Sequence, residues 1–448
     1  MTAPLELRIP KEVERVVARL HGAGHEAYVV GGCVRDALRG EEPGDWDVAT
    51  NATPEQIQEL FRRSLYTNRF GTVVVRAGAR EIEVTTYRVE APYGDHRRPD
   101  AVAFTDSLEA DLSRRDFTMN AMAWRPPGEL VDPFGGRRDL EARTVRAVGD
   151  PDERFREDAL RMLRAVRFAT VLGFQIEPGT AEAIRRNAPL ASALSGERVQ
   201  QEIVKILGAE RPSAGFRLLS ELGLLAVLCP ELDRCRETPQ DKAAAQDVFE
   251  HSLATCDAAP ANDLVLRLAA LLHDVGKPDT FADGHFHQHE FVGEAIARQI
   301  LRRWRFPKDV ISQVSHLIRH HMFWYQEEWT GSAVRRFVRK VGLEHIPALF
   351  ALRRADNIGS GARIPRMYAL ESLWLRVREE IERATAFSKR DLVVDGHDIM
   401  REVGVPQGPE VGRILDALFE RVLDDPELNE RGRLLALARE LRAASAKV

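Results

Sequence analysis

The sequence predicts an α+β fold, in which an N-terminal part combines a β-sheet with helices and a longer remainder is helical. Two observations support this prediction. In residues 1–125, short β-rich runs alternate with helical patterns. From about Glu153 onward the strand signals end, and apolar residues recur with a helical period, as in Ala159 to Val171, Val199 to Leu207 and Leu264 to Leu272.

The N-terminal elements are expected in alternating order, each bounded by glycine, proline or a capping residue. In chain order they are a strand at Tyr28 to Val30 ending at Gly31-Gly32, a helix at Cys33 to Leu38, a strand at Asp45 to Ala49, a helix capped by Thr53-Pro54 and running through Arg62, and strands at Thr72 to Arg76 and Glu81 to Arg88.

Composition excludes several classes of protein. With 44% hydrophobic and 30% charged residues over 448 positions, the chain is neither disordered nor fibrous and is long enough for about three domains. It contains no apolar run of membrane-spanning length and no signal sequence, so we expect a soluble, cytoplasmic protein. Four scattered cysteines indicate neither disulfides nor a cysteine-based metal site. A net charge of −5 means that a nucleic acid would have to meet a locally basic surface.

Carboxylates in two of the expected strands are candidates for a metal site. Asp45 and Asp47 are two residues apart, a spacing that places both side chains on one face of a strand. Glu83, in the alternating run Glu81 to Thr86, could supply a third carboxylate. Oxygen ligands of this kind suit Mg²⁺ bound to a nucleoside triphosphate. A solvated turn and a polar outer sheet face remain the alternatives.

A phosphate site is expected where the first strand ends. Gly31-Gly32 would expose backbone amides at the start of a helix, and Arg35 lies one turn further on. The alternative is a tight turn in which Arg35 forms a structural ion pair.

A third candidate lies on an expected helix from Arg156 to Phe168. Asp158 and Arg161 are three residues apart and would be neighbours on its surface, with Arg164 and Arg167 continuing the ridge. A carboxylate beside a guanidinium can present a base-like hydrogen-bonding edge. A solvated helix face is the alternative.

These segments together resemble the class II tRNA nucleotidyltransferase and poly(A) polymerase family. The resemblance rests on the motifs Gly31 to Asp36, Asp45 to Thr50, Arg114 to Ala121 and Asp132 to Gly136, in that order. It implies a polymerase-β-like head followed by a helical neck, body and tail. The implied activity is template-independent addition of CMP and AMP, from CTP and ATP, to tRNA 3′ ends.

The family also implies roles for particular residues. Asp45 and Asp47 would hold Mg²⁺, and Asp158 with Arg161 would select the base. Nucleotide contacts would come from Arg115, Arg164 and Arg167. Glu197-Arg198 and Glu202 would support the base-selecting segment.

A histidine-rich region follows. The dipeptide His273-Asp274 ends an apolar helix, and further candidates are His251, His285, His287, His289, His320, His321 and Asp356. Imidazole and carboxylate ligands suit Mn, Fe, Co, Ni or Zn, and a metal-bound water would hydrolyse phosphoesters. A buried histidine paired with its neighbour is the alternative.

This region resembles the HD phosphohydrolase superfamily, which implies His251, His273, Asp274 and Asp356 as ligands of one metal. His289 and His321, or less securely His320, would be available for a second. The expected domains are a nucleotidyltransferase head (1–150), a neck and body (151–240), an HD domain (241–385) and a tRNA-binding tail (386–448). We expect no membrane association and no obligate protein partner.

Several functional alternatives remain open. A relative that adds only CC or only A, or a poly(A) polymerase, would share most of these motifs. The polar stretch from Glu90 to Asp100 corresponds to the loop that the family uses to switch from C to A, and its length favours full CCA addition. Alternatives of other classes are an HD phosphohydrolase whose head only binds nucleotide and a non-catalytic RNA-binding protein.

Overall fold

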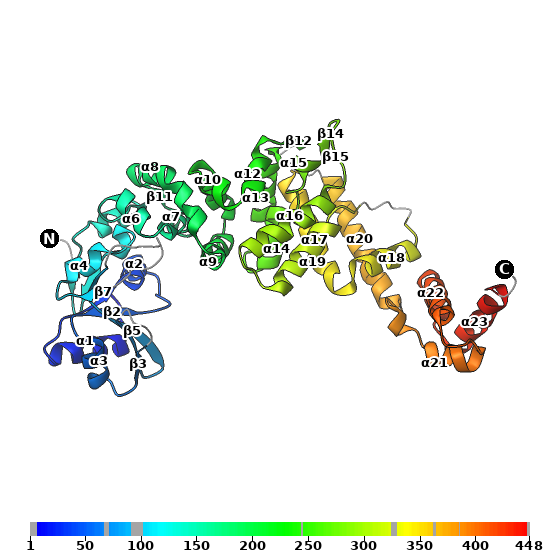
Figure 1. The fold of residues 1–448 in the computed structure, drawn as a ribbon, viewed down its shortest axis with the longest axis horizontal. Helices are drawn as coiled ribbons and strands as arrows, with labels where there is room; N and C mark the ends of the chain where they lie inside the picture. Colours follow the sequence, from blue (N-terminus) through cyan, green and yellow to red (C-terminus); the bar gives the residue numbers. More distant parts are fainter. Residues whose placement is uncertain are drawn as a thin grey trace. The chain divides into compact units, whose positions relative to one another are not determined.

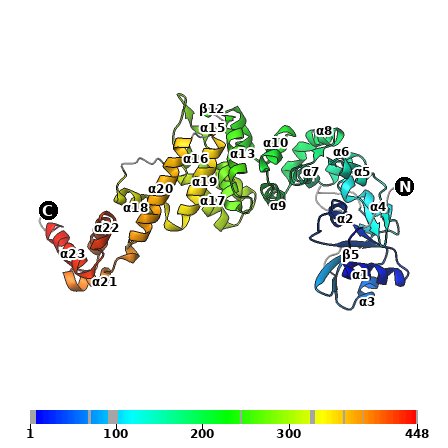
Figure 2. The ribbon, with the colours of Figure 1, turned by 180° about the vertical axis from the view of Figure 1, so that it is seen from behind.

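The computed structural model describes residues 7–66, 71–90, 102–242, 245–323, 329–361, 364–384 and 386–445. The chain divides into two compact units, Met1–Asp233 with Arg303–Arg305, and Arg234–Arg302 with Phe306–Val448. Figures 1 and 2 draw the ribbon from opposite sides. Within the described ranges, no helix is both long enough and apolar enough to cross a membrane. Residues 91–100 of the expected switching loop lie outside the described residues.

The first unit contains a seven-stranded mixed sheet with the strand order β3-β4-β5-β2-β1-β8-β9. Strands β2 and β5 run parallel, and the other neighbours are antiparallel. The strands of this sheet are β1 (Ala27–Val30), β2 (Asp47–Thr50), β3 (Ser64–Tyr66), β4 (Thr72–Ala77), β5 (Arg80–Thr86), β8 (Ala123–Arg125) and β9 (Glu129–Val131). A separate antiparallel pair consists of β6 (Arg88–Glu90) and β7 (Val102–Phe104).

The mixed sheet confirms the α+β prediction. Burial alternates along β5, where Ile82 and Val84 are buried and Glu83 is exposed. Helices α1 (Lys11–Gly22) and α3 (Pro54–Leu60) pack beside the sheet, where they contact β4 (Figure 1). A capping box between Thr53 and Gln56 starts α3 as expected, although the helix ends before Arg62.

Strand β2 is shorter than the sequence predicted. It begins at Asp47, and Asp45 lies exposed in a bend before it. The reason is pairing: the ladder with β5 begins at Asp47, and the ladder with β1 begins at Val48. Asp45 therefore does not share a strand face with Asp47.

The helix expected from Arg156 to Phe168 is also interrupted, which corrects the prediction. Helix α6 (Pro151–Glu157) ends before Asp158, whose backbone is extended, and α7 (Leu160–Leu172) begins two residues later. The Asp158 carboxylate accepts a hydrogen bond from the Leu160 amide at 3.0 Å. Aspartate side chains commonly bond nearby amides in this way and interrupt helices.

The rest of the first unit is helical apart from the short parallel pair β10 (Thr144–Val145) and β11 (Gln175–Ile176). Its other helices are α2 (Gly32–Leu38), α4 (Leu108–Ser113), α5 (Gly136–Glu141), α8 (Pro178–Asn187), α9 (Gly196–Leu207), α10 (Pro212–Glu221), α11 (Leu224–Leu228) and α12 (Pro230–Asp233).

The second unit confirms the helical remainder, with α13 packed on α14 and α19. Its helices are α13 (Val248–Ala258), α14 (Leu264–Leu272), α15 (Lys277–Thr280), α16 (His289–Arg303), α17 (Lys308–His320), α18 (Gly331–Val341), α19 (Ile346–Gly359), α20 (Ile364–Arg383), α21 (Gly396–Asp398), α22 (Pro409–Asp424) and α23 (Arg431–Ser445). Two short ladders, unforeseen because they are too brief to show a period, are β12 (Pro239–Lys242) with β13 (Ala245–Asp247), and β14 (Phe281–Ala282) with β15 (His285–Phe286). From Ala386 onward the chain buries a separate apolar cluster around Leu418 and Leu434.

Candidate active site

A cavity of about 380 Å³ in the first unit gathers most of the candidate residues of the head. It is lined by Gly32, Arg35, Asp47, Arg114, Arg115, Asp116, Asn120, Asp158, Leu160, Arg161, Arg164, Phe168 and Arg198. Seven of these residues were expected from the sequence. Gly31, Asp45, Glu83 and Arg167 are not among the lining residues, although Gly31 and Glu83 lie next to residues that are.

The carboxylates form a charged edge of this site. Asp47 stands opposite Glu83 in the parallel pair of β2 and β5. Burial, followed by the charge of Glu83 and with a smaller effect of Asp45, raises the pKa of Asp47 to about 6, although Arg115 lowers it. Negative groups brought this close favour either a proton or a cation between them.

Two arginines lie against the glycine turn, Arg115 at Gly31 and Arg35 at Gly32. Gly31 has φ of +84°, and a Cβ atom there would lie 2.7 Å from Nη1 of Arg115. Glycine is therefore required both by the backbone conformation and by the approach of Arg115. Arg35 forms a bidentate pair with Asp36 at 2.8 Å and donates to Asn120 at 2.7 Å. The structural ion pair that was the alternative for Arg35 is therefore present, and Arg35 also lines the cavity in which the phosphate site was expected.

The buried Asp116 carboxylate fixes two other side chains in the wall of the cavity. Asp116 accepts hydrogen bonds from Asn120 at 3.1 Å and from Nε of Arg164 at 2.7 Å. Burial opposes ionisation, but the charge of Arg164 and these hydrogen bonds lower the pKa of Asp116 to about 2. Arg164 is thereby held in the wall as a fixed cation.

The pair expected to select the base is assembled differently from the prediction. Asp158 and Arg161 line the same cavity, but each has its own partners. The Asp158 carboxylate accepts a hydrogen bond from Arg198 at 2.7 Å. Arg161 donates to Glu157 at 2.6 Å and to the Arg114 carbonyl at 3.0 Å. These contacts fix the directions of both side chains.

Arg167 lies against α9 instead of the cavity. Its Nε is 2.6 Å from the buried Glu202 carboxylate, and its guanidinium stacks 3.7 Å from the Phe168 ring centroid. Burial lowers the pKa of Arg167, although Glu202 counteracts this effect. In this position Arg167 supports α7, and the nucleotide contact expected of it stays a prediction.

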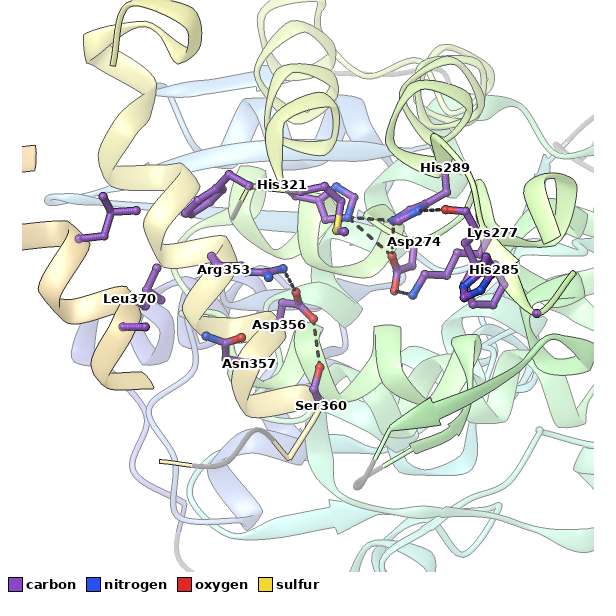
Figure 3. A pocket seen from close by; sticks show the side chains of 16 residues that line it. Asp274, Lys277, His285, His289, His321, Arg353, Asp356, Asn357, Ser360 and Leu370 are labelled. Atoms are coloured by element: carbon purple, nitrogen blue, oxygen red, sulfur yellow. Dashed lines mark hydrogen bonds and ion pairs between the residues drawn. The ribbon is translucent and has the colours of Figure 1, made fainter. Parts of the chain in front are cut away.

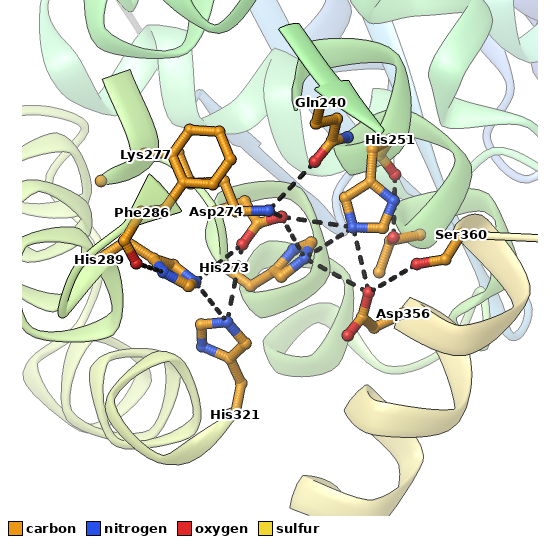
Figure 4. A network of polar contacts seen from close by, with 12 residues as sticks. Gln240, His251, His273, Asp274, Lys277, Phe286, His289, His321, Asp356 and Ser360 are labelled. Atoms are coloured by element: carbon orange, nitrogen blue, oxygen red, sulfur yellow. Dashed lines mark hydrogen bonds and ion pairs between the residues drawn. The ribbon is translucent and has the colours of Figure 1, made fainter. Parts of the chain in front are cut away.

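In the second unit, six of the expected metal ligands lie together, with Asp274 at the centre of the other five (Figure 4). Oδ2 of Asp274 lies 3.2 Å from Nε2 of His273 and 3.4 Å from Nε2 of His251. Its other oxygen, Oδ1, lies 3.2 Å from Nε2 of His289 and 3.7 Å from Nε2 of His321. Asp356 closes the first side, with Oδ1 at 3.1 Å from Nε2 of His251. We call these six residues the histidine cluster.

The histidine cluster has the donor set of a two-metal site. His273 and His321 each direct Nδ1 at a backbone carbonyl, of Ala270 at 2.8 Å and of Ile318 at 2.7 Å, which assigns the proton to Nδ1 and the lone pair to Nε2. Burial lowers the pKa of both imidazoles, so they stay neutral and able to bind a cation. Groups of three ligand atoms form on each side of Asp274. A cation on each side would satisfy the converging lone pairs.

Comparison with known proteins places this chain. Family models match it as a poly A polymerase head domain at residues 27–146, a probable RNA and SrmB-binding site of polymerase A at 173–236 and an HD domain at 245–360. It is 35% identical over 428 residues to the CCA-adding enzyme of Geobacillus stearothermophilus, with 95% of this chain and 96% of that protein covered. The chain belongs to the CCA-adding enzyme family.

Further relatives agree with this assignment to the CCA-adding enzyme family. The CCA-adding enzyme of Geobacillus kaustophilus is 35% identical over 432 residues, and the match covers 94% of each chain. The crystal structure of the Bacillus stearothermophilus CCA-adding enzyme in complex with CTP superimposes with a TM-score of 0.73 at 32% identity, covering 100% of both chains. The fold and the order of domains are therefore those of the family.

As a member of the CCA-adding enzyme family with an HD domain, the chain depends on divalent metal ions. The residues present fit this requirement. In the head, Asp47 and Glu83 offer hard oxygen ligands in adjacent strands. In the second unit, the mixed imidazole and carboxylate set of the histidine cluster matches a softer divalent metal.

Sequence reasoning missed some site residues and left one choice open. Asp116 and Asn120 belong to the motif Arg114 to Ala121, so their position beside Arg115 was an available signal. Of the two adjacent histidines, His321 joins the cluster, whereas the His320 ring stacks 4.5 Å from His316. His285 and His287 lie exposed after β14, outside the cluster.

Proposed function

We propose that this chain is a CCA-adding tRNA nucleotidyltransferase, which transfers two CMP and one AMP from CTP and ATP to tRNA 3′ ends. The observation that carries the proposal is the cavity of the first unit, where Asp47, Gly32, Asp158 and six arginines meet within a chain of this family. The oxygen of the RNA 3′-hydroxyl forms a bond to the α-phosphorus. The bond between the α-phosphorus and the oxygen that bridges it to the β-phosphorus breaks, and pyrophosphate is released.

Different residues are proposed to bind the metal and the triphosphate during this transfer. Asp45, Asp47 and Glu83 would hold the metal, which we propose to be Mg²⁺. When bound, this ion would lower the pKa of the 3′-hydroxyl and neutralise triphosphate charge. Gly31, Gly32 and Arg35 are proposed to bind the triphosphate, with Arg115 and Arg164 as further cationic contacts.

Base selection is proposed to rest on two fixed side chains. Asp158 presents acceptors whose direction is set by Arg198, and Arg161 presents donors whose direction is set by Glu157. Cytosine and adenine both offer an amino donor beside a ring acceptor, so one such edge can pair with either. Arg167, through Glu202, is proposed to keep α7 in place.

The domain boundaries are part of the same proposal. We assign the head to residues 1–150, the neck and body to 151–240, the HD domain to 241–385 and a tRNA-binding tail to 386–448. A cytoplasmic location is part of this proposal, because the substrates tRNA, CTP and ATP are available there. CC-only, A-only and poly(A) addition remain the alternatives that an assay must separate.

Single-nucleotide resolution of the products tests the proposal. The protein is incubated with Mg²⁺ and tRNA lacking its 3′ trinucleotide, with CTP alone, ATP alone or both. Addition of CC with CTP and of CCA with both nucleotides is expected, together with loss of both products in Asp47→Asn. Arrest at CC with both nucleotides would indicate a CC-only relative. No extension by the wild type would refute the transferase function.

A second activity is favoured by the histidine cluster. We propose that it is a metal-dependent phosphohydrolase site using Mn, Ni, Co, Fe or Zn. Hydrolysis of p-nitrophenyl phosphate should require one of these ions, disappear in Asp274→Asn and persist in Asp47→Asn. Activity that survives Asp274→Asn would contradict this assignment, and loss in Asp47→Asn would place the hydrolysis in the head.

A further inference from the structure

A cavity of about 390 Å³ adjoins the histidine cluster, and residues outside the cluster also line it. One wall is a face of helix α19, from which Arg353, Asp356 and Asn357 project, together with Ser360 directly after the helix (Figure 3). These positions are three, four and seven residues from Arg353, a spacing that places them on one side of a helix. Of this row, Arg353 is the residue with a permanent positive charge.

Arg353 is fixed at one end and open at the other. Its Nη1 donates to Oδ2 of Asp356 at 2.8 Å, whereas Oδ1 of the same carboxylate faces His251 at 3.1 Å. Among the described residues, Nε and Nη2 of Arg353 have no hydrogen-bond partner. The side chain is 19% exposed. A guanidinium held this way offers two aligned donors at the rim of the cluster.

Lys277, the other lysine or arginine among the lining residues, already has hydrogen-bond partners. Nζ of Lys277 lies 2.5 Å from Oδ2 of Asp274 and 3.1 Å from Oε1 of Gln240. Both acidic lining residues, Asp274 and Asp356, are thus paired with a cation. An anion that enters the cavity therefore meets Arg353 without an opposing unpaired carboxylate among the lining residues.

We infer that Arg353 is a phosphate-binding residue of this cavity, an inference that rests on the phosphohydrolase activity proposed above for the histidine cluster. A guanidinium binds two oxygens of a phosphate at once through parallel N–H donors. The apolar side of the cavity, formed by Met322, Phe323, Leu370 and Leu373, would cover the organic group of the ligand. The ligand class is therefore a phosphate ester with an apolar or planar organic group.

The test uses the full-length protein loaded with Mn²⁺ and compares Arg353→Met, Arg353→Lys and Arg354→Met. Arg354 is the matched control, because it is the next residue of α19, is 62% exposed and pairs with Glu371 at 3.9 Å. Calorimetry gives the Kd of Mn²⁺ and, separately, the Kd of inorganic phosphate. Hydrolysis of p-nitrophenyl phosphate gives kcat and KM.

Loss of a charge-assisted contact predicts that Arg353→Met weakens phosphate binding and raises KM by about 10- to 100-fold. Arg353→Lys should fall between this variant and the wild type, and Arg354→Met should match the wild type. Mn²⁺ affinity should fall as well, because loss of a hydrogen-bond partner of a metal ligand typically lowers metal affinity by about 10- to 100-fold. The phosphate Kd and the KM are therefore compared at Mn²⁺ concentrations that saturate each variant. If Arg353→Met does not fold, Arg353→Lys decides the question.

Two results would overturn the inference. An unchanged phosphate Kd in the Arg353 variants would exclude contact with the ligand. Restoration of wild-type phosphate affinity in the Arg353 variants at saturating Mn²⁺ would mean that Arg353 only positions Asp356. If the wild type binds phosphate through Arg353 but hydrolyses no ester, the inference holds and the proposed phosphohydrolase activity fails, so the two outcomes are distinguishable.

Discussion

Asp47 lies directly opposite Glu83 in the parallel pair formed by β2 and β5. Ile82 and Val84 on either side of Glu83 are buried, so the strand cannot rotate to separate the two carboxylates. The structure therefore holds two negative groups together at the edge of a nucleotide-sized cavity. Binding of a divalent cation would relieve the repulsion between the two carboxylates. Substitution of either carboxylate should therefore change metal dependence or stability.

Glu83→Gln should weaken the dependence of nucleotide addition on Mg²⁺. Loss of a residue that only supports a metal ligand typically lowers metal affinity by about 10- to 100-fold, and loss of a ligand carboxylate should cost at least as much. The Mg²⁺ concentration for half-maximal CMP addition should rise accordingly. Glu81→Gln is the matched control, because Glu81 is on the same strand face but pairs with the exposed Arg76 at 2.9 Å. Equal effects of the two substitutions would argue against a role for Glu83 in the metal site.

Asp47→Asn should stabilise the metal-free protein at neutral pH while removing activity. The pKa of Asp47 rises from 3.8 to about 6, so the folded protein holds this proton more tightly than the unfolded chain does. The resulting stability is present below about pH 4 and is lost as pH rises through about 6. At pH 7 the ionised side chain is destabilising, and its removal should raise the unfolding free energy by about 1 kcal/mol after allowance for partial exposure.

Thermal unfolding without metal at pH 4 and pH 7 checks this prediction. The variant should melt above the wild type at pH 7 and level with it at pH 4. In saturating Mg²⁺ the order should reverse, because the wild type gains stability from binding. A variant that is less stable at pH 7 without metal would show that Asp47 contributes to folding through some other contact.

Gly31→Ala should impair nucleotide binding beyond its effect on stability. Both Gly31 and Gly24 have strongly positive φ, +84° and +89°, a conformation that alanine adopts only with strain. A Cβ at Gly31 would also displace Arg115, whereas at Gly24 nothing lies within 4 Å. The KM for CTP should therefore rise in Gly31→Ala and stay unchanged in Gly24→Ala, while both variants lose melting temperature. An unchanged KM for CTP in Gly31→Ala would show that Arg115 does not contribute to CTP binding.

His321→Ala should lose metal affinity that His320→Ala retains. His321 directs Nε2 at Asp274 and lies 3.3 Å from Nε2 of His289. Burial, followed by the charge of His316, lowers the pKa of His320 to about 4, and its ring packs on His316. Titration with Ni²⁺ should show at least about tenfold weaker binding at one site in His321→Ala. The opposite pattern would mean that the two side chains exchange places when metal binds.

Local sequence signals were sufficient for much of the head. Alternation in the run Glu81 to Thr86 predicted which residues of β5 are buried, because neighbouring side chains of a strand point to opposite faces. The capping residue Thr53 and the proline after it located the start of α3. Signals of this kind depend on a few consecutive residues, and tertiary contacts do not override them here.

Local periodicity failed where a side chain competes with the backbone. Asp158 and Arg161 have the spacing of helical neighbours, yet the Asp158 carboxylate bonds the Leu160 amide and breaks the helix. The direction of each side chain is then set by Arg198 and Glu157. Arg198 is forty residues further along the chain from Asp158, so no local pattern could assign this contact.

The sequence by itself determined the fold class, the order of the segments and the residue types available for metal and nucleotide chemistry. Tertiary structure decided which of these residues meet. Parallel pairing of β2 with β5 placed Glu83 beside Asp47, and the packing of α13, α14, α16, α17 and α19 brought histidines from distant positions to Asp274. Spacing along one helix or strand is encoded locally, whereas contact between separate elements depends on how their apolar faces pack.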